Sequence, residues 1–533
     1  MHVCTQSRPK YGNLSPDSQE RGQPKKCTDH GKVDYDASRE HPKAVRSQGP
    51  DQPFPNGGCV PARAALFSVV RLGLMNDVPS VLSPTEGRES REPGSLPRRL
   101  GVWSALAVVV GSTIGSGIFR SPAGIADKLP GALPFLSIWI LGGLFALCGA
   151  LALSEIASHL PRTGGFFAFL REGWGRLPAF LFGWGQLTIV RAAALGAIAI
   201  TFAEYLLRLV GIDPTVPPHN MTARYVAAAA IAFTATANIL GVRWGAALIN
   251  VTAVAKFLGL AFIVALALAV GLPRGGGHFA PLIPAEPITA GAFGLALVSV
   301  LWAYDGWADV SYVAGEVKDP QRSLPKAIIG GTLAVLGIYL MANVGYLSVL
   351  SMDEIRSSKL VAADVAERLI GRPGTVFVSA TVMVSTFGTL SAVLLTSPRV
   401  LFAMADDGML FRPIARVHPK YQTPYAAIAL VAFLGLVFVL TRTFEQLADT
   451  FVIAMIPFYA LGVAAVYRLR RRPGYRPAFR TPGYPVVPAL FILSVAYLLL
   501  NALTTAGSRV SSAVIFGVLL LGIPVYRWTV GRR

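Results

Sequence analysis

The chain has 533 residues, of which 53% are hydrophobic and only 14% charged, and its mean hydropathy is +0.52. Soluble domains carry about 25% charged residues, so this composition excludes an ordinary soluble protein. The net charge is +19 and the pI is near 10, a balance that can indicate nucleic-acid binding. Here the positive residues lie in a polar N-terminal stretch and between apolar segments. They therefore indicate membrane topology and no nucleic-acid partner.

Residues 1–94 are rich in Pro, Gly, Ser and charged residues, and we expect this N-terminal tail to be disordered. No signal peptide begins at Met1, because "MHVCTQSRPK" has no apolar core. Met75 is followed by a short polar lead and then by the first apolar segment. We hypothesise that translation starts at Met75 and that residues 1–74 are not part of the native protein.

Apolar segments of about 20 residues recur after residue 100, which predicts an all-α polytopic membrane protein. Loops on one side of the predicted membrane hold about twice as many Lys and Arg residues as loops on the other, so both termini are expected to be cytoplasmic. The arginine-rich stretch 468–477 fits either a loop attracted to anionic membrane lipid or a simple topology determinant. The twelve expected spans are 101–127, 131–158, 176–208, 222–241, 244–271, 289–315, 324–351, 374–405, 425–441, 445–468, 484–506 and 509–529.

The first span contains "LAVVVGSTIGSGIFRSP", with three glycines, two serines and a threonine in its middle. These residues are poor choices for a helix interior, so the pattern predicts a break. In hydrocarbon each freed backbone N–H or C=O needs a partner, at several kcal/mol per group if it finds none. The break must therefore face protein or line a cavity.

Four charged residues in or near the middle spans are weaker signals. Arg191 lies within span three, where a structural partner inside the bundle is expected rather than substrate contact. Glu155 and Glu204 lie near span ends and are expected to be interfacial. Lys256 lies inside "NVTAVAKFLGLAFIVALAL", where a charge costs roughly 2.5–3.5 kcal/mol on insertion scales and indicates function. The alternative is a snorkelling lysine that reaches the cytoplasmic interface.

The sixth span contains the second break, in "SVLWAYDGWADVSYVAGEVKDP", where Asp305, Gly306 and Asp309 interrupt the apolar run. If spans one to five and spans six to ten are two repeats, spans one and six are the first helix of each repeat. Interrupted segments at such corresponding positions indicate a transporter site. The alternative is a pair of flexible kinks with no ligand. We expect residues 95–470 to form this repeat core, and residues 471–533 to add spans eleven and twelve and a short cytoplasmic C-terminus.

The ends of broken helices carry complementary partial charges. Unwinding leaves N–H groups free where one half-helix begins and C=O groups free where another ends. The first carries partial positive charge and suits a carboxylate, and the second carries partial negative charge and suits an ammonium. A free α-amino acid holds both groups close together, which makes it the expected ligand.

Seven stretches, in order along about residues 98–420, carry a family resemblance. They are "GSTIGSGIF", "PRTGGFFAFLREGWG", "FGWGQLTIVRAAALGAIAITFAEYL", "AKFLGLAFIV", "LWAYDGWADVSYVAGEVKDPQRSLPKAI", "YLMANVGYLSVLS" and "STFGTLSAVLLTSPRVLFAMADDGML". In these stretches the chain resembles the amino acid–polyamine–organocation superfamily, and within it the L-type amino acid transporter family.

The resemblance implies an inverted-repeat fold with a five-plus-five helix core, discontinuous spans one and six, and alternating access. It implies that Lys256 couples span five to broken span one in place of a sodium ion, and that Trp302 is an aromatic gate over the substrate. The implied substrate-binding residues are Thr113, Ile114, Gly115, Ser116, Gly117, Trp302, Ala303, Tyr304 and Asp305.

Two departures from the mammalian members bear on the substrate. Asp305 stands where they have glycine, and its carboxylate fits either a cationic substrate or a local role as a helix cap or hydrogen-bond acceptor. Ala308 replaces a polar residue, which leaves side-chain selectivity open. The loop "VGIDPTVPPHNMTA" lacks the cysteine that tethers mammalian light subunits to a glycoprotein, so no disulfide-linked heavy subunit is expected.

The sequence contains no catalytic motif, no metal-ligand spacing among its His residues and no disulfide framework among its four cysteines. We expect no enzyme activity, no metal and no cofactor. The sequence predicts an amino acid permease of the plasma (inner) membrane, with neutral substrates, working as an exchanger or a proton-linked carrier. The alternatives are a polyamine or organic amine permease, and a transport-dead amino acid sensor.

Overall fold

The computed structural model describes most of the chain that follows the N-terminal tail. The described residues are 98, 100–161, 164–214, 216–241, 245–273, 278–406, 408–409, 412–421 and 423–530. The expectations for the tail 1–94, including the start at Met75, lie outside these residues. Within the described ranges the secondary structure is helical and contains no β-strand.

Each of the twelve expected spans corresponds to a helix or a pair of helices. In chain order these are α1 Val102–Thr113 with α2 Gly117–Lys128, α3 Ala132–His159, α5 Arg176–Gly185 with η1 Gln186–Val190 and α6 Arg191–Leu209, α7 His219–Ile239, α8 Gly245–Leu266 with η2 Ala267–Gly271, α9 Ala290–Tyr304 with η3 Asp309–Glu316, α10 Pro320–Val349, α13 Arg372–Asp406, α14 Tyr425–Thr441, α15 Phe444–Leu469, α16 Val486–Thr504 and α17 Arg509–Thr529.

Length and hydropathy identify most of these helices as membrane spans. In the described residues eight helices are long and apolar enough to cross a membrane, and α1 with α2, bent by 44°, makes a ninth. The remaining expected spans are α7, α9 and α14, of 21, 15 and 17 residues. The chain is thus an all-α multi-pass membrane protein. The division into a 95–470 core and a 471–533 extension stays a prediction.

Shorter helices connect the spans: α4 Gly165–Trp174, α11 Met352–Ser357, α12 Val361–Ile370 and η4 Arg412–Ala415. A capping box begins α11, in which the Ser351 hydroxyl accepts from the Glu354 N–H and the Glu354 carboxylate accepts from the Ser351 N–H. The Ser351 N–H and the Arg368 guanidinium lower the pKa of the Glu354 carboxyl to about 2. The cap therefore keeps its charge until the pH falls to that value.

Both predicted breaks are present, and they differ in kind. After α1 the backbone of Ile114 is extended, and a new helix begins three residues later at Gly117. After α9 the backbone of Asp305 is extended, and Gly306 follows with φ of +119°, a conformation that L side chains rarely adopt. The chain then continues as the 3₁₀ segment η3. Glycine is thus required at the second break by the backbone itself.

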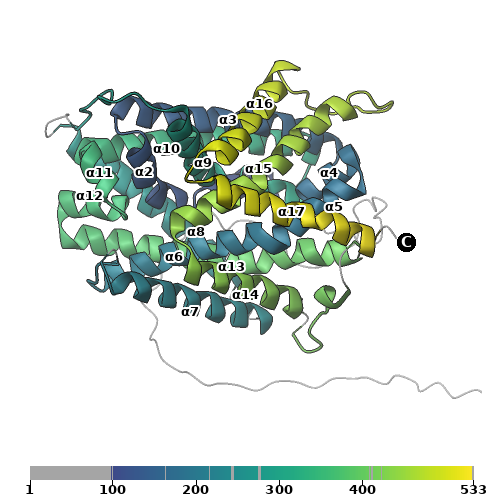
Figure 1. Ribbon diagram of the computed structural model, residues 1–533, viewed down its shortest axis with the longest axis horizontal. Helices are drawn as coiled ribbons and strands as arrows, with labels where there is room; N and C mark the ends of the chain where they lie inside the picture. Colours follow the sequence, from purple (N-terminus) through teal and green to yellow (C-terminus); the bar gives the residue numbers. More distant parts are fainter. Residues whose placement is uncertain are drawn as a thin grey trace, which may run out of the picture. The chain divides into compact units, whose positions relative to one another are not determined.

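The packing pairs each of the first four spans with the span five places later. In the described residues α2 packs on α9, α3 on α10, α6 on α13 and α7 on α14. Figure 1 shows α6, α13, α14 and α7 gathered in one part of the molecule, and α3, α9 and α10 in another. This pairing is what two five-helix repeats related by a pseudo-two-fold axis give. It agrees with the predicted five-plus-five core with discontinuous helices one and six.

A buried ion pair fixes the chain beyond α15 to the end of α3. The Glu155 carboxylate has no exposed surface and accepts from the Arg470 guanidinium at 2.7 and 2.6 Å. It also accepts from the Thr481 N–H at 2.7 Å. The expectation that Glu155 lies at the membrane interface stays a prediction, and the structure shows that protein covers it. Glu155 lies near a helix end, but this helix end is covered by the segment from Arg470 to Thr481.

Replacement of Glu155 by Ala is expected to destabilise the protein. The change leaves the Arg470 guanidinium and the Thr481 N–H without their acceptor, at a cost of about 2–3 kcal/mol. The measurement is the midpoint of thermal unfolding of the detergent-purified protein, followed by size-exclusion chromatography. The matched control is Glu172→Ala, because Glu172 pairs with Arg472 on the surface, where both side chains are more than 40% exposed and an ion pair contributes at most about 1 kcal/mol. Equal decreases in the unfolding midpoint for the two variants would contradict the structural role of Glu155.

Candidate functional site

The two breaks lie directly against each other. A Cβ atom at Gly117 would lie 2.5 Å from the Ala303 Cα, and one at Gly306 would lie 2.7 Å from the Thr113 N. The start of α2 therefore contacts the end of α9, and the turn after α9 contacts the end of α1. The structure thus brings together the residues that the sequence predicted at separate points of the chain.

The predicted site residues are almost completely enclosed. Gly115 and Asp305 retain partial exposure, and the others are buried. The Thr113 hydroxyl donates to the Val109 carbonyl at 2.8 Å, so it supports its own helix. The buried residues are Thr113, Ile114, Ser116, Gly117, Trp302, Ala303 and Tyr304.

The carbonyl groups at the ends of α1 and α9 meet at one side chain that the sequence analysis missed. The Tyr339 hydroxyl of α10 lies 2.9 Å from the Thr113 oxygen and 3.0 Å from the Ala303 oxygen. Tyr339 has no exposed surface. A signal for it existed in the sequence, because Tyr339, Asn343 and Tyr346 follow one another at the i, i+4, i+7 spacing of a single helix face.

The first turn of α2 is also supported by tyrosines. Pro122 has no N–H, so the Ile118 carbonyl loses its usual partner within the helix. The Tyr346 hydroxyl lies 3.5 Å from that carbonyl oxygen, and the Tyr205 hydroxyl donates to the Phe119 oxygen at 3.2 Å. The Tyr346 side chain of α10 thereby lies near the carbonyl that Pro122 leaves open, and the Tyr205 side chain of α6 adds a second contact to the first turn of α2.

The two aromatic residues before the second break point in different directions. The Trp302 ring lies edge-on to Phe444 and Phe451, with centroid distances of 6.2 and 5.0 Å. The Tyr304 hydroxyl donates to the Trp139 carbonyl of α3 at 3.0 Å. Tyr304 can therefore serve a substrate only through its backbone.

Asp305 has partners inside the protein. Its carboxylate accepts from the Tyr459 hydroxyl at 2.5 Å, and Arg191 acts on both Asp305 and Asp309 as an opposite charge. Asp309 also accepts a hydrogen bond from Ser112. The Tyr459 contact agrees with a local role for Asp305, and the structural role expected for Arg191 stays a prediction.

A small cavity lies beside Asp305, between α3, α9 and α15. Its volume is about 10 Å³, near the lower limit for one water molecule. This volume is too small for an amino acid. The lining residues are Phe145, Ala146, Leu301, Tyr304, Asp305, Trp307, Phe451, Val452, Met455, Ile456 and Tyr459.

Lys256 is directed at the first break and does not reach the surface. Its amine is buried, with 6% of the residue exposed, and donates to the Gly111 carbonyl of α1. The snorkelling alternative therefore does not describe this conformation. Gly111 lies two residues before the end of α1, so the amine holds span five against the first break.

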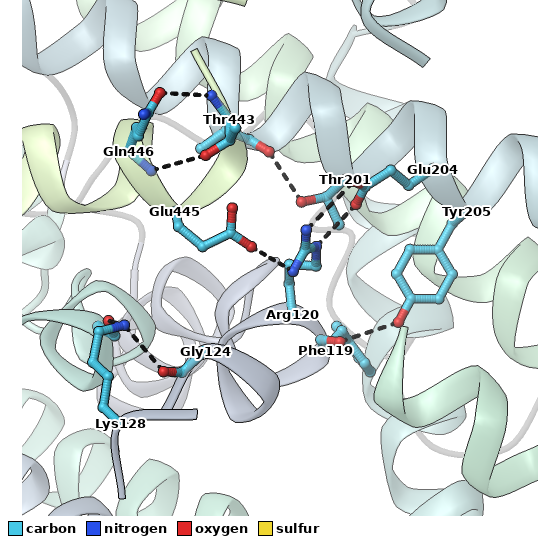
Figure 2. Close-up of polar contacts among 12 residues, drawn as sticks. Phe119, Arg120, Gly124, Lys128, Thr201, Glu204, Tyr205, Thr443, Glu445 and Gln446 are labelled. Atoms are coloured by element: carbon cyan, nitrogen blue, oxygen red, sulfur yellow. Dashed lines mark hydrogen bonds and ion pairs between the residues drawn. The ribbon is translucent and has the colours of Figure 1, made fainter. Parts of the chain in front are cut away.

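A buried arginine joins three helices on the other side of the first break (Figure 2). Arg120 of α2 pairs with Glu204 of α6 at 2.9 Å and with Glu445 of α15 at 2.8 Å. Its guanidinium also lies 4.9 Å from the centre of the Phe444 ring. The Arg120 and Glu204 side chains are 4% and 10% exposed, whereas Glu445 is 42% exposed. The expectation that Glu204 lies at the membrane interface stays a prediction, and the structure shows that Glu204 neutralises a buried charge.

The contact between Gly117 and Ala303 can be tested by Gly117→Ala. The added methyl group forces α2 and α9 apart, and such overpacking costs about 1–3 kcal/mol. If this contact shapes the site, transport of the expected amino acids falls about tenfold. The control is Gly337→Ala on α10, where an added Cβ has nothing within 4 Å. Normal transport by the Gly117 variant would show that the contact is not needed.

Several known proteins resemble this chain in sequence. The sequence model of the amino acid permease family matches residues 100–524. The chain is 32% identical to the "Serine/threonine exchanger SteT" of Bacillus subtilis, over 82% of this chain and 97% of that protein. It is 31% identical to the human "b(0,+)-type amino acid transporter 1", over 77% and 84% of the two chains.

Among solved structures, the chain resembles MhsT in complex with L-phenylalanine. The TM-score is 0.51 at 13% identity, over 78% of this chain and 98% of that one, which supports the transporter fold alone. The resemblance to the amino acid–polyamine–organocation superfamily and its L-type members is confirmed by the sequence relatives. The chain belongs to the amino acid permease family.

Proposed function

We propose that the chain is a secondary active transporter of amino acids in the plasma (inner) membrane, working by alternating access. The observation that carries the proposal is the meeting of the two breaks. The start of α2 lies against the end of α9, and the carbonyls that end α1 and α9 converge. One small ligand with an ammonium and a carboxylate matches these opposite partial charges.

In this proposal the carboxylate binds at the start of α2. The first N–H groups of a helix have no partner within it, and they carry partial positive charge. Ser116 occupies the N-cap position but its side chain makes no capping hydrogen bond, so its hydroxyl remains for the substrate. Gly115 and Gly117 let the carboxylate approach the backbone closely. The ammonium binds the Thr113 and Ala303 carbonyls.

Neutral amino acids are the proposed substrates. A cationic side chain would need an acidic partner, and the Asp305 carboxylate already accepts from Tyr459 and lies within reach of the Arg191 charge. The same contacts argue against a polyamine or organic amine as the main substrate. Trp302 is proposed to cover the bound amino acid.

Exchange is the proposed mode of transport, since the relative from Bacillus subtilis is named an exchanger. We also propose that both termini are cytoplasmic, which places the Arg120 cluster on the outer side. No disulfide-linked heavy subunit is required, because the loop 210–218 between α6 and α7 contains no cysteine.

Reconstitution into proteoliposomes tests the function. The assay measures uptake of a panel of labelled neutral and cationic amino acids and amines, with and without unlabelled amino acid inside and with and without a pH gradient. We expect uptake of neutral amino acids to be stimulated several-fold by internal amino acid. Uptake driven only by a proton gradient would contradict exchange and would show that transport is coupled to protons.

Two other outcomes would contradict the proposal more deeply. Preferred uptake of polyamines or other amines would make the chain an amine permease. Saturable binding of an amino acid to the purified protein, with no uptake under any condition, would make it a sensor.

The proposed coupling role of Lys256 is tested by Lys256→Met, which keeps the length of the side chain and removes its charge. The Gly111 carbonyl then loses a charged donor, and such hydrogen bonds contribute about 1.5–3 kcal/mol. We expect the rate of exchange to fall about tenfold or more. Lys326→Met is the control, because Lys326 is exposed at the start of α10. A normal rate and affinity for the Lys256 variant would remove this residue from the mechanism.

A further inference from the structure

The last part of the chain carries positive charge and no acidic residue of its own. Residues 450–533 contain ten arginines and no Asp, Glu or Lys. Six of these arginines lie in residues 468–480, at the end of α15 and in the loop that leads to α16. Any carboxylate that neutralises them must therefore come from another part of the protein.

Two carboxylates from earlier helices reach this loop. Glu155 of α3 pairs with Arg470 at 2.6 Å, and Glu172 of α4 pairs with Arg472 at 2.5 Å. Each carboxylate carries a single negative charge. These two pairs are therefore neutral, and they compensate none of the remaining arginines.

Three other arginines of the loop have no acidic partner among the described residues. Arg471, Arg476 and Arg480 are exposed, and no carboxylate in the described ranges forms an ion pair with them. The loop therefore carries three uncompensated positive charges at the surface, and such a cluster attracts an anion from outside the protein.

The backbone that carries two of these arginines is fastened to α3. After residue 480, the Thr481 N–H donates to the Glu155 carboxylate at 2.7 Å. Before residue 476, the Tyr475 ring lies with its centre 4.5 Å from that of the His159 ring. An ordered loop loses less conformational freedom on binding than a flexible one does, so this arrangement favours a bound ligand.

The loop lies at the level where lipid headgroups are expected. It joins α15 to α16, and both helices are long and apolar enough to cross a membrane. At its base the Tyr467 and Tyr484 rings lie 5.3 Å apart, and the Arg470 guanidinium lies 3.7 Å from the centre of the Tyr484 ring. Tyrosine is enriched at membrane–water interfaces. Lipid phosphates are therefore the most concentrated anions around these arginines.

We propose that Arg471, Arg476 and Arg480 form a binding surface for anionic phospholipid headgroups in the cytoplasmic leaflet. The side of the membrane rests on the proposed cytoplasmic termini, whereas the binding itself does not depend on amino acid transport. The headgroup of phosphatidylglycerol offers a phosphate with no cation of its own. The headgroup of phosphatidylcholine carries a compensating ammonium, so the surface selects the anionic class.

The test measures the midpoint of thermal unfolding of the full chain in neutral detergent, with rising amounts of phosphatidylglycerol or phosphatidylcholine in mixed micelles. We expect phosphatidylglycerol to raise the midpoint by several degrees, because a ligand that binds the folded state stabilises it. Phosphatidylcholine is expected to have little effect. Inorganic phosphate at the same concentrations is expected to have none, which separates a lipid headgroup from a free anion.

The variant with Arg471→Gln, Arg476→Gln and Arg480→Gln combined tests the three residues. An arginine near an anionic surface contributes about fivefold in affinity, so the phosphatidylglycerol concentration for half the shift is expected to rise about tenfold or more. The same three residues changed to Lys keep their charge and are expected to keep the response, which checks that the loop tolerates substitution. Arg509→Gln is the control, because this exposed arginine is separated from the loop by the whole of α16.

An equal response of the triple Gln variant and the unaltered protein would overturn the inference and would leave the arginines as a topology determinant. Equal shifts from the two phospholipids would also overturn it, as would a full shift from inorganic phosphate alone. An effect of Arg509→Gln as large as that of the triple Gln variant would show that overall charge, and not this surface, controls the response. These measurements involve no amino acid, so their outcome is independent of the proposed transport function.

Discussion

The structure depends on one constraint, the cost of leaving backbone hydrogen-bonding groups unpaired away from water. Two helices of the bundle are broken, and each break opens carbonyl groups that the helix would otherwise satisfy. Side chains of neighbouring spans contact these carbonyls: Tyr339 from α10 and Lys256 from α8. The broken helices are therefore stable only inside this bundle, and the same backbone groups are the ones that we propose to bind the substrate.

Charges in the interior are arranged by the same logic. Arg120 joins α2 to α6 and α15 through two carboxylates, and Glu155 joins α3 to the segment after α15 through Arg470. In these two clusters each charge is paired, because an isolated charge in the interior is costly. Glu445 is the most exposed partner, which makes its bond the one most weakened by water.

Much of the fold could be predicted from the sequence because its causes are local. Glycine and polar residues inside apolar segments marked both breaks, and the pairing of spans one and six followed from counting. The partners of Tyr339, Glu155 and Glu204 could not be predicted, because these contacts join residues far apart in the chain. A tyrosine in an apolar span looks like any other aromatic core residue, and a carboxylate near a helix end looks interfacial until its arginine is known.

The π-helical turn Gln186–Val190 in span three shows how one inserted residue changes which side of a helix faces its neighbours. A turn that is one residue wider than an α-helical turn rotates everything after it by about 100° relative to what precedes it. Before the turn, α5 packs on α4 and α17, and after it, α6 packs on α13 and α14. A single span thus presents different faces to its neighbours before and after the turn, and Arg191 is the first residue of the rotated part.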